Sequence, residues 1–254
     1  MTERLTVAEL LVRALEEEGV SHVFGVPGEE NEDLLFALEA SSISFVPTRH
    51  EQGAAFMANV WGRLTGRAGV CLATLGPGAT NLITGVADAN LDKAPLVAIT
   101  AQGSLDRLHH ESHQTLDIVS MFRPITKWNS TVAGPAIVTE VVRKAFKVAE
   151  SEKPGSTHIE LPEDVASLPA PIDLRPLPRS KVRRPGPDQK AIEVAAGLIR
   201  QANRPLILAG NGAIRRRASE HLTRLATTFD IPVVSTFMGK GSISDRLPQS
   251  LFTV

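Results

Sequence analysis

The feature that most constrains the fold of this 254-residue chain is a repeated alternation of continuous apolar runs with helical segments. Apolar residues at helical spacing end at Gly19, and the apolar run HVFGV (22–26) follows directly. The same order then recurs, with helices expected at 31–40, 51–66, 80–92 and 135–152 and strands at 43–48, 69–76, 95–102 and 156–162. Continuous apolar strands that are each separated by a helix predict an α/β fold with a parallel sheet and helices on both faces.

A proline-rich stretch, 162–187, holds seven of the chain's seventeen prolines and interrupts this order. We therefore expect an α/β domain over residues 1–165, a linker stiffened by proline over 166–187, and a second Rossmann-like unit over 188–254. The second unit has about two strand–helix pairs, too few to cover both faces of an independent sheet. We expect it to be the incomplete start of a central domain, and the sequence to be a fragment of a longer chain.

The charge balance gives no reason to expect nucleic acid or a membrane as a partner. Lysine and arginine number 27 against 28 aspartates and glutamates, so the net charge is −1. The basic run RSKVRR (179–184) is expected to be solvated linker, because no aromatic residues interleave it. The N-terminus has no signal-peptide pattern, and no apolar stretch reaches the roughly 18 residues of a membrane span. The sequence therefore predicts a soluble, cytoplasmic protein.

The single cysteine, Cys71, excludes an internal disulfide and lies in an apolar run, where we expect it to be a buried core residue.

Three glycine-containing segments follow expected strands, at 25–31 (GVPGEEN), 48–54 (TRHEQGA) and 74–81 (TLGPGATN). We expect them to be loops at the carboxyl ends of the strands, where parallel α/β sheets bind ligands. Glycine allows the backbone to approach a ligand closely, and the next helix offers free N–H groups. Ordinary tight turns remain an alternative for each loop. A plain NAD-binding domain is disfavoured, because Asn81 stands where the dinucleotide fingerprint has its third glycine.

Glu51 differs from these loops because it begins a helix of small and apolar residues that is suited to burial. As an exposed charge at a helix start it would contribute only about 0.3–1 kcal/mol. Beside a buried surface it would instead be a candidate for proton exchange. The spacing alone leaves both interpretations open.

Several segments together resemble the pyrimidine-binding domain of thiamine diphosphate-dependent enzymes, and within that family the catalytic (large) subunit of acetolactate synthase. The match runs almost continuously over residues 4–165 and continues loosely to the end. The segments that carry it are GVPGEE, RHEQGAAFMA, GRLTG, GVCLATLGPGATNLITGVADANLDKAPLVAITAQ and SHQTLDIVSMFRPITKW.

The resemblance implies a role for Glu51. In this family the matching glutamate hydrogen-bonds a ring nitrogen of the cofactor's aminopyrimidine and favours its imino tautomer, which then takes the proton from the thiazolium carbon. By the same match Pro77 and Asn81 would line the pyrimidine pocket, together with Val26 and Pro27.

The resemblance also implies residues nearer the substrate. Gln114 would reach the reacting end of the cofactor. His113 precedes it where many biosynthetic members carry phenylalanine, which looks more like the catabolic acetolactate synthases. Lys127 matches a lysine near the substrate entrance, although an exposed structural lysine fits equally well. No other ligand-type residue stands at a spacing from His109 and His110 that is typical of metal sites. We therefore expect both histidines to lie at the surface, and we expect no metal site in this chain.

The implied cofactors are thiamine diphosphate and Mg²⁺, the metal being bound by a C-terminal domain with a GDG motif that is absent here. FAD is implied only for biosynthetic members, where AGNGAI (209–214) would be its first glycine turn. Family members place each cofactor between two subunits, so the resemblance implies a homodimer or homotetramer.

The function expected from the resemblance is condensation of two pyruvates, or of pyruvate and a second 2-oxo acid, to 2-acetolactate or its homologue with loss of CO₂. The fragment alone is expected to be inactive. Two alternatives stay open: another member such as sulfoacetaldehyde acetyltransferase, oxalyl-CoA decarboxylase or pyruvate oxidase, and a non-catalytic dimerising module.

Overall fold

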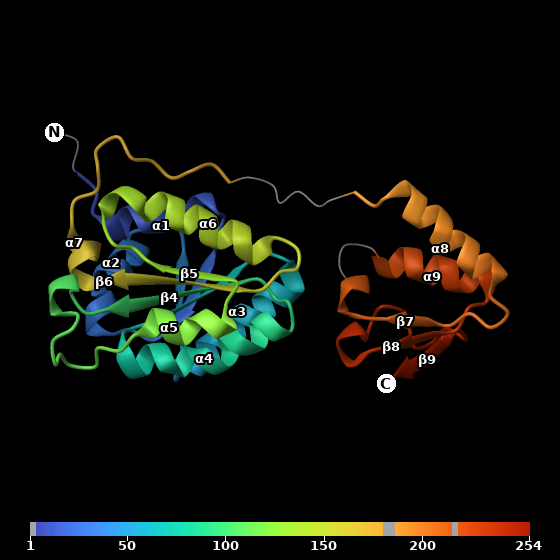
Figure 1. Ribbon diagram of the computed structural model, residues 1–254. Coiled ribbons are helices and arrows are strands. Elements are labelled where there is room, and N and C mark those ends of the chain that lie inside the picture. The colour runs from blue at the N-terminus through green and yellow to red at the C-terminus, as the bar shows by residue number, and fades with distance from the viewer. Residues whose placement is uncertain (1–3, 180–185, 215–217) are drawn as a thin grey trace. The chain divides into compact units, whose positions relative to one another are not determined.

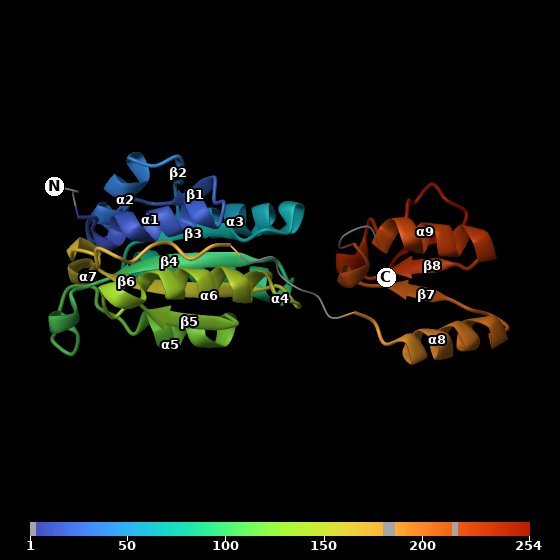
Figure 2. The same ribbon diagram turned by 90° about the horizontal axis from the view of Figure 1, so that it is seen from above.

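The computed structural model describes residues 4–179, 186–214 and 218–254. The chain forms two compact units, residues 1–184 and 185–254, which are each described separately. Figures 1 and 2 show the elements of both units. The domain and linker bounds expected from the sequence remain predictions.

The first unit is built on a six-stranded sheet in the order β2-β1-β3-β4-β6-β5, in which every neighbouring pair is parallel. Its strands are β1 His22–Gly25, β2 Ser44–Pro47, β3 Gly69–Ala73, β4 Leu96–Gln102, β5 Trp128–Thr131 and β6 Ser156–Pro162. This sheet confirms the α/β fold class that the apolar runs predict.

Helices cover both faces of this sheet (Figures 1 and 2). One face carries α1 Val7–Glu17, α2 Glu32–Glu39, α6 Val138–Glu150 and α7 Glu163–Ser167, and the other carries α3 Glu51–Thr65, α4 Gly76–Leu91 and α5 Ile118–Phe122. Side chains of β3 alternate between the two cores: Val70 and Leu72 pack with α1 and α6, whereas Cys71 and Ala73 pack with α3 and α4. A strand that is buried on both faces has to be apolar throughout. This is why the residues of β3 form a continuous apolar run in the sequence.

Small residues let α3 and α4 pack closely. Ala54, Ala55 and Ala58 of α3 are fully buried. A Cβ added at Gly85 of α4 would lie 2.6 Å from Cβ of Ala55, so only glycine fits there. Because the two helices lie close together, their first turns converge at the carboxyl edge of the sheet.

The sequence interpretation was wrong about two segments of the first unit. No helix or strand is expected from the sequence over residues 103–134, but this region contains α5 and the edge strand β5, whose four residues are all half-buried and show no apolar alternation. The segment 74–81 was expected to be a loop, but α4 already begins at Gly76, with proline in its first turn. Proline is common there because the first helical N–H groups need no intrahelical acceptor.

Part of the expected linker packs on the first unit. The backbone N–H of Ala170 donates to Leu5 O at 2.8 Å, and that of Val7 donates to Leu168 O at 2.9 Å. Of the basic run at 179–184, only Arg179 belongs to the described residues.

Cys71 is completely buried, as expected, and its burial raises the pKa of the thiol.

The second unit holds a parallel sheet in the order β7-β8-β9. Its strands are β7 Ile207–Ala209, β8 Val233–Ser235 and β9 Ser250–Thr253, and its helices are α8 Gln189–Gln201 and α9 Ala218–Phe229. The sequence interpretation missed β9. No helix in the described ranges is long and apolar enough to cross a membrane.

A buried charge cluster lies at the amino edge of the sheet in the first unit. Glu18, directly after α1, is 3% exposed, and its Oε1 lies 2.5 Å from Nη1 of Arg143. Arg179 pairs with the neighbouring Glu150 at 3.3 Å. Burial raises the pKa of Glu18 to about 7 against the opposing attraction of Arg143. The folded protein therefore holds this proton more tightly than the unfolded chain does.

We predict that Glu18 makes the free energy of unfolding fall as the pH rises from about 4.5 to 7. The difference in unfolding free energy between wild type and Glu18→Gln should shrink by roughly 1–3 kcal/mol over this window. Urea unfolding at several pH values measures this difference. Glu17→Gln, an exposed neighbour on α1, is the control and should keep the wild-type slope. Parallel pH profiles for wild type and Glu18→Gln would contradict the prediction.

Candidate active site

The strand order of the sheet reverses between β1 and β3. The chain leaves β1 toward β2 on one side and returns as β3 on the other, and ligands of open α/β sheets bind outside the carboxyl ends of the strands at such a point. The two strand ends touch: Oγ1 of Thr74 donates to Oε2 of Glu30 at 2.5 Å. A Cβ at Gly28 would lie 2.5 Å from Cβ of Thr74, so glycine is needed for this contact.

Glu51 is the first residue of α3 and lies at the same edge of the sheet. The preceding residue, His50, caps the helix, because its Nδ1 accepts from the N–H of Gln52 at 3.1 Å. Oε2 of Glu51 accepts from Nδ2 of Asn81, on α4, at 3.0 Å. This hydrogen bond joins the first turn of α3 to the second turn of α4 and fixes the direction of the carboxylate.

The second carboxylate oxygen of Glu51 is open. Among the residues that the structure describes, none donates a hydrogen bond to its Oε1. A Cβ at Gly78 would lie 3.3 Å from Oε1, so the glycine keeps this side of the carboxylate uncovered. Glu51 itself is half-exposed, which is less buried than the small-residue helix had indicated. The result is an oriented carboxylate with one oxygen available to a ligand.

Gln114 lies against the start of α4. A Cβ at Gly76 would be 2.5 Å from the backbone O of Gln114 and 2.8 Å from its Cβ. Both residues have positive φ, +51° at Gly76 and +55° at Gln114. For a residue other than glycine this conformation costs on the order of 1–3 kcal/mol and is typical of functional sites. The structure thus brings Gln114 to the same edge as Glu51 and Asn81.

The remaining predicted site residues divide into two groups. Pro77 lies in the first turn of α4, Val26 and Pro27 directly follow β1, and His113 is exposed beside Gln114, so all four lie at the carboxyl edge. Lys127 is not brought together with them.

Lys127 precedes β5, at the amino edge of the sheet. Its Nζ donates to the carbonyls of Val148 and Ser151, at 2.5 and 2.7 Å, and so caps the end of α6. Burial lowers the pKa of Lys127. These contacts fit the structural interpretation of this lysine.

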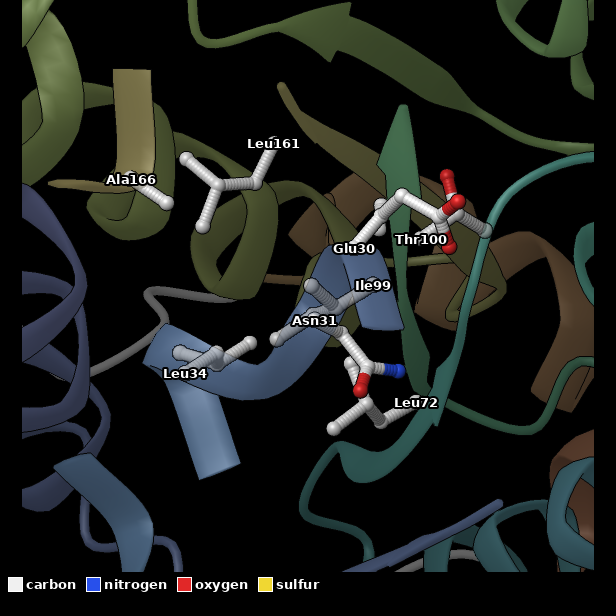
Figure 3. Close-up of a pocket in the computed structure, with 9 residues that line it drawn as sticks. Glu30, Asn31, Leu34, Leu72, Ile99, Thr100, Leu161 and Ala166 are labelled. Carbon is white, nitrogen blue, oxygen red and sulfur yellow. The ribbon is translucent and has the colours of Figure 1, made fainter. Parts of the chain in front are cut away.

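A small cavity lies near the carboxyl ends of β3, β4 and β6 (Figure 3). It measures about 10 Å³, room for about one water molecule. Glu30, Asn31 and Thr100 supply its polar lining, and Leu34, Leu72, Ile99, Ala101, Leu161 and Ala166 the rest. Nδ2 of Asn31 has no partner in the described structure. The cavity is too small to hold a cofactor ring.

Sequence reasoning missed a set of carboxylates beside this edge. Glu160, at the end of β6, and Glu163 and Asp164, in α7, all bond to the loop that carries Gln114 or to its stem. The signal that could have found them is the run ELPED (160–164), three carboxylates directly after a buried apolar strand. Within the described ranges, no three His, Cys, Asp or Glu side chains are grouped so that they could hold a metal ion.

Two protein-family models match this chain. Residues 5–121 match the model of the thiamine pyrophosphate enzyme N-terminal TPP binding domain, and residues 192–254 match the model of the thiamine pyrophosphate enzyme central domain. The chain belongs to the thiamine pyrophosphate enzyme family. Thiamine pyrophosphate is the same compound as thiamine diphosphate, so the family expected from the sequence motifs is confirmed. All residues that converge on Glu51 lie within the first matched range.

Three curated relatives are named as acetolactate synthase or its probable large subunit. The chain is 42% identical over 250 residues to the probable acetolactate synthase large subunit of Methanocaldococcus jannaschii, which covers 96% of this chain and 42% of the relative. It is 41% identical over 259 residues to acetolactate synthase of Arthrospira platensis, covering 98% of this chain and 44% of the relative. For acetolactate synthase of Mycobacterium bovis the identity is 38% over 254 residues, covering 98% and 41%. The chain thus spans less than half the length of these relatives.

Proposed function

We propose that this chain supplies the aminopyrimidine side of a thiamine diphosphate site in an acetolactate synthase, which condenses two molecules of pyruvate to 2-acetolactate with release of CO₂. The observation that carries the proposal is the Glu51 carboxylate. Asn81 orients it at the carboxyl edge of the sheet, and its Oε1 is free to accept a hydrogen bond from a ligand. The names of the relatives support the choice of reaction. The cytoplasmic location expected from the sequence stays a prediction.

The residues around Glu51 at the carboxyl edge of the sheet fit an aminopyrimidine ring. Such a ring needs a hydrogen-bonding partner for its ring nitrogen, which the open Oε1 of Glu51 offers. It needs space beside that oxygen, which Gly78 leaves because it has no side chain. It also needs apolar surfaces for its faces, and Val26, Pro27 and Pro77 are the residues we assign to them.

When bound, thiamine diphosphate supplies the carbanion chemistry of decarboxylation and carbon–carbon bond formation. The part of this chain is proton transfer and orientation. Asn81 holds Oε2 of Glu51, which leaves Oε1 as the oxygen that would exchange a proton with the ring nitrogen. Gln114 and His113 are exposed in the loop over the start of α4, and we assign them to the polar groups of the 2-oxo acid.

Mg²⁺ and FAD are further parts of the proposal. Mg²⁺ would be bound with the diphosphate by a different domain. For FAD, the turn after β7 is the candidate: a Cβ at Gly212 would meet no atom within 4 Å, so packing does not require this glycine and the backbone is open to a ligand. Substrate profiling with pyruvate and other 2-oxo acids would identify the acceptor.

A homo-oligomer is proposed from the outer face of α3. Phe56, Met57, Val60 and Leu64 are exposed at spacings that place them on one stripe, with Val60 50% and Leu64 82% exposed. A contiguous apolar stripe of this kind marks an interaction surface. Because α3 begins with Glu51, an interface along it would place a second subunit close to the site.

The first prediction from this proposal concerns Glu51. In the polypeptide as its native source produces it, Glu51→Gln should lower kcat for acetolactate formation from pyruvate, with thiamine diphosphate and Mg²⁺, by at least about 100-fold, because the proton at Oε1 is lost. Far-UV circular dichroism should stay unchanged. Glu32→Gln is the matched control, since Glu32 is the exposed first residue of α2. Normal turnover by Glu51→Gln would contradict the proposal. Turnover of sulfoacetaldehyde or oxalyl-CoA in place of pyruvate would favour the other family members, sulfoacetaldehyde acetyltransferase or oxalyl-CoA decarboxylase.

The second prediction concerns the oligomer. Val60→Glu places a charge in the centre of the apolar stripe and should shift the protein to monomers in sedimentation velocity. Phe36→Glu, which changes an exposed aromatic residue of α2 outside the stripe, should leave the sedimentation coefficient unchanged. If both variants sediment like the wild type, α3 is not the interface.

A further inference from the structure

The loop 103–117 carries Gln114. It is held at its first end by the carboxylates of Glu163 and Asp164, and near its second end by the amide of Gln102, which also bonds Glu160. We infer that the buried pair Gln102–Glu160 is a positioning device that holds Gln114 over the start of α4. Its consequence for catalysis rests on the proposed function, whereas the positioning itself does not.

The first end of the loop is bound to α7. The N–H of Ser104 donates to Oε1 of Glu163 at 3.1 Å, and the N–H of Leu105 donates to Oδ1 of Asp164 at 3.2 Å. Arg107 adds an ion pair to Glu163 at 3.0 Å. These bonds lie near the protein surface and fix where the loop leaves the sheet.

The second end is bound inside the protein. Nε2 of Gln102, the last residue of β4, donates to the carbonyl of Leu116 at 2.8 Å and to Oε2 of Glu160 at 3.1 Å. Oε1 of Gln102 accepts from the N–H of Gly103 at 3.0 Å. Gln102 and Glu160 are 2% and 4% exposed. Both the oxygen and the nitrogen of the Gln102 side-chain amide are thus hydrogen-bonded, and the nitrogen bonds the loop at Leu116 as well as Glu160.

Glu160 determines which way that amide faces. Its Oε1 accepts from Oγ1 of Thr131 at 2.8 Å, which leaves Oε2 for Gln102. Burial raises the pKa of Glu160, and the hydrogen bonds from Thr131 and Gln102 oppose the rise. The described structure gives this carboxylate no cationic partner. Two apolar side chains would join β4 to β6 at lower cost, so the polar pair is retained for the direction it gives to the amide of Gln102.

The held carbonyl is two residues from Gln114. Gln114 meets Gly76 on one side, and Leu116 is tied to Gln102 on the other. The left-handed backbone at Gln114, with φ +55°, has to be maintained by contacts on both sides. Release of Leu116 would therefore let Gln114 relax away from α4.

The test is an exchange of the two side chains, Gln102→Glu with Glu160→Gln. The double variant keeps an amide–carboxylate hydrogen bond between β4 and β6, but a carboxylate at position 102 has no N–H to give to Leu116. Hydrogen exchange of residues 108–116, measured by mass spectrometry on the 254-residue chain, should become about tenfold faster, because one hydrogen bond is lost. The thermal midpoint should stay close to that of the wild type.

Thr157→Val is the control for general destabilisation. It removes buried hydrogen bonds from β6 to the carbonyls of Leu96 and Ala145 without touching Gln102, Glu160 or Leu116, so exchange of 108–116 should stay at the wild-type rate. Wild-type exchange in the double variant, or equal acceleration in Thr157→Val, would overturn the inference. If the double variant does not fold, Glu160→Gln alone decides: it should accelerate exchange about threefold, since an amide is a weaker acceptor than a carboxylate, and no acceleration would overturn the inference.

A kinetic measurement separates this inference from the proposed function. In the polypeptide from the native source, the double variant should lower kcat for acetolactate formation with little change in KM. Faster exchange with unchanged kcat would overturn the catalytic consequence. Exchange is measured without cofactor or substrate, so it decides the positioning even if the protein proves to have no carboligase activity.

Discussion

The hydrogen bond from Asn81 to Glu51 is the interaction on which the site depends, and it exists because two helices lie unusually close together. Gly85 and Ala55 allow that approach, since any larger side chain at position 85 would separate α3 from α4. The carboxylate then lies at the carboxyl edge of the sheet, with one oxygen fixed and one open. Helix packing inside the domain thereby sets the geometry of a charge at its edge.

Much of this arrangement could be predicted from the sequence. Strands such as β3 are buried on both faces and so consist of uninterrupted apolar residues, which is a strong local signal. The parallel sheet follows from their alternation with helices, and the parallel sheet in turn places Glu51 and the 74–81 segment at one edge. Resemblance to the family then gave the glutamate a role that its spacing alone had left open.

The rest depends on contacts between distant segments, which no local pattern records. β5 is a half-buried edge strand and carries no alternation. The hydrogen bond between Gln102 and Glu160 joins residues 58 positions apart, and the run ELPED (160–164) does not indicate which residue Glu160 contacts. The motif around Lys127 matched the family, but its sequence does not record that the Nζ of this lysine bonds the carbonyls at the end of α6, at the amino edge of the sheet.

The central claim is that the open oxygen of Glu51 receives the aminopyrimidine ring of thiamine diphosphate. The most direct measurement is an experimental structure of the polypeptide, isolated from its native source, with thiamine diphosphate and Mg²⁺ bound. The account predicts a ring nitrogen within hydrogen-bond distance of Oε1 of Glu51, with Asn81 still donating to Oε2. A cofactor whose ring makes no contact with Glu51 would contradict it.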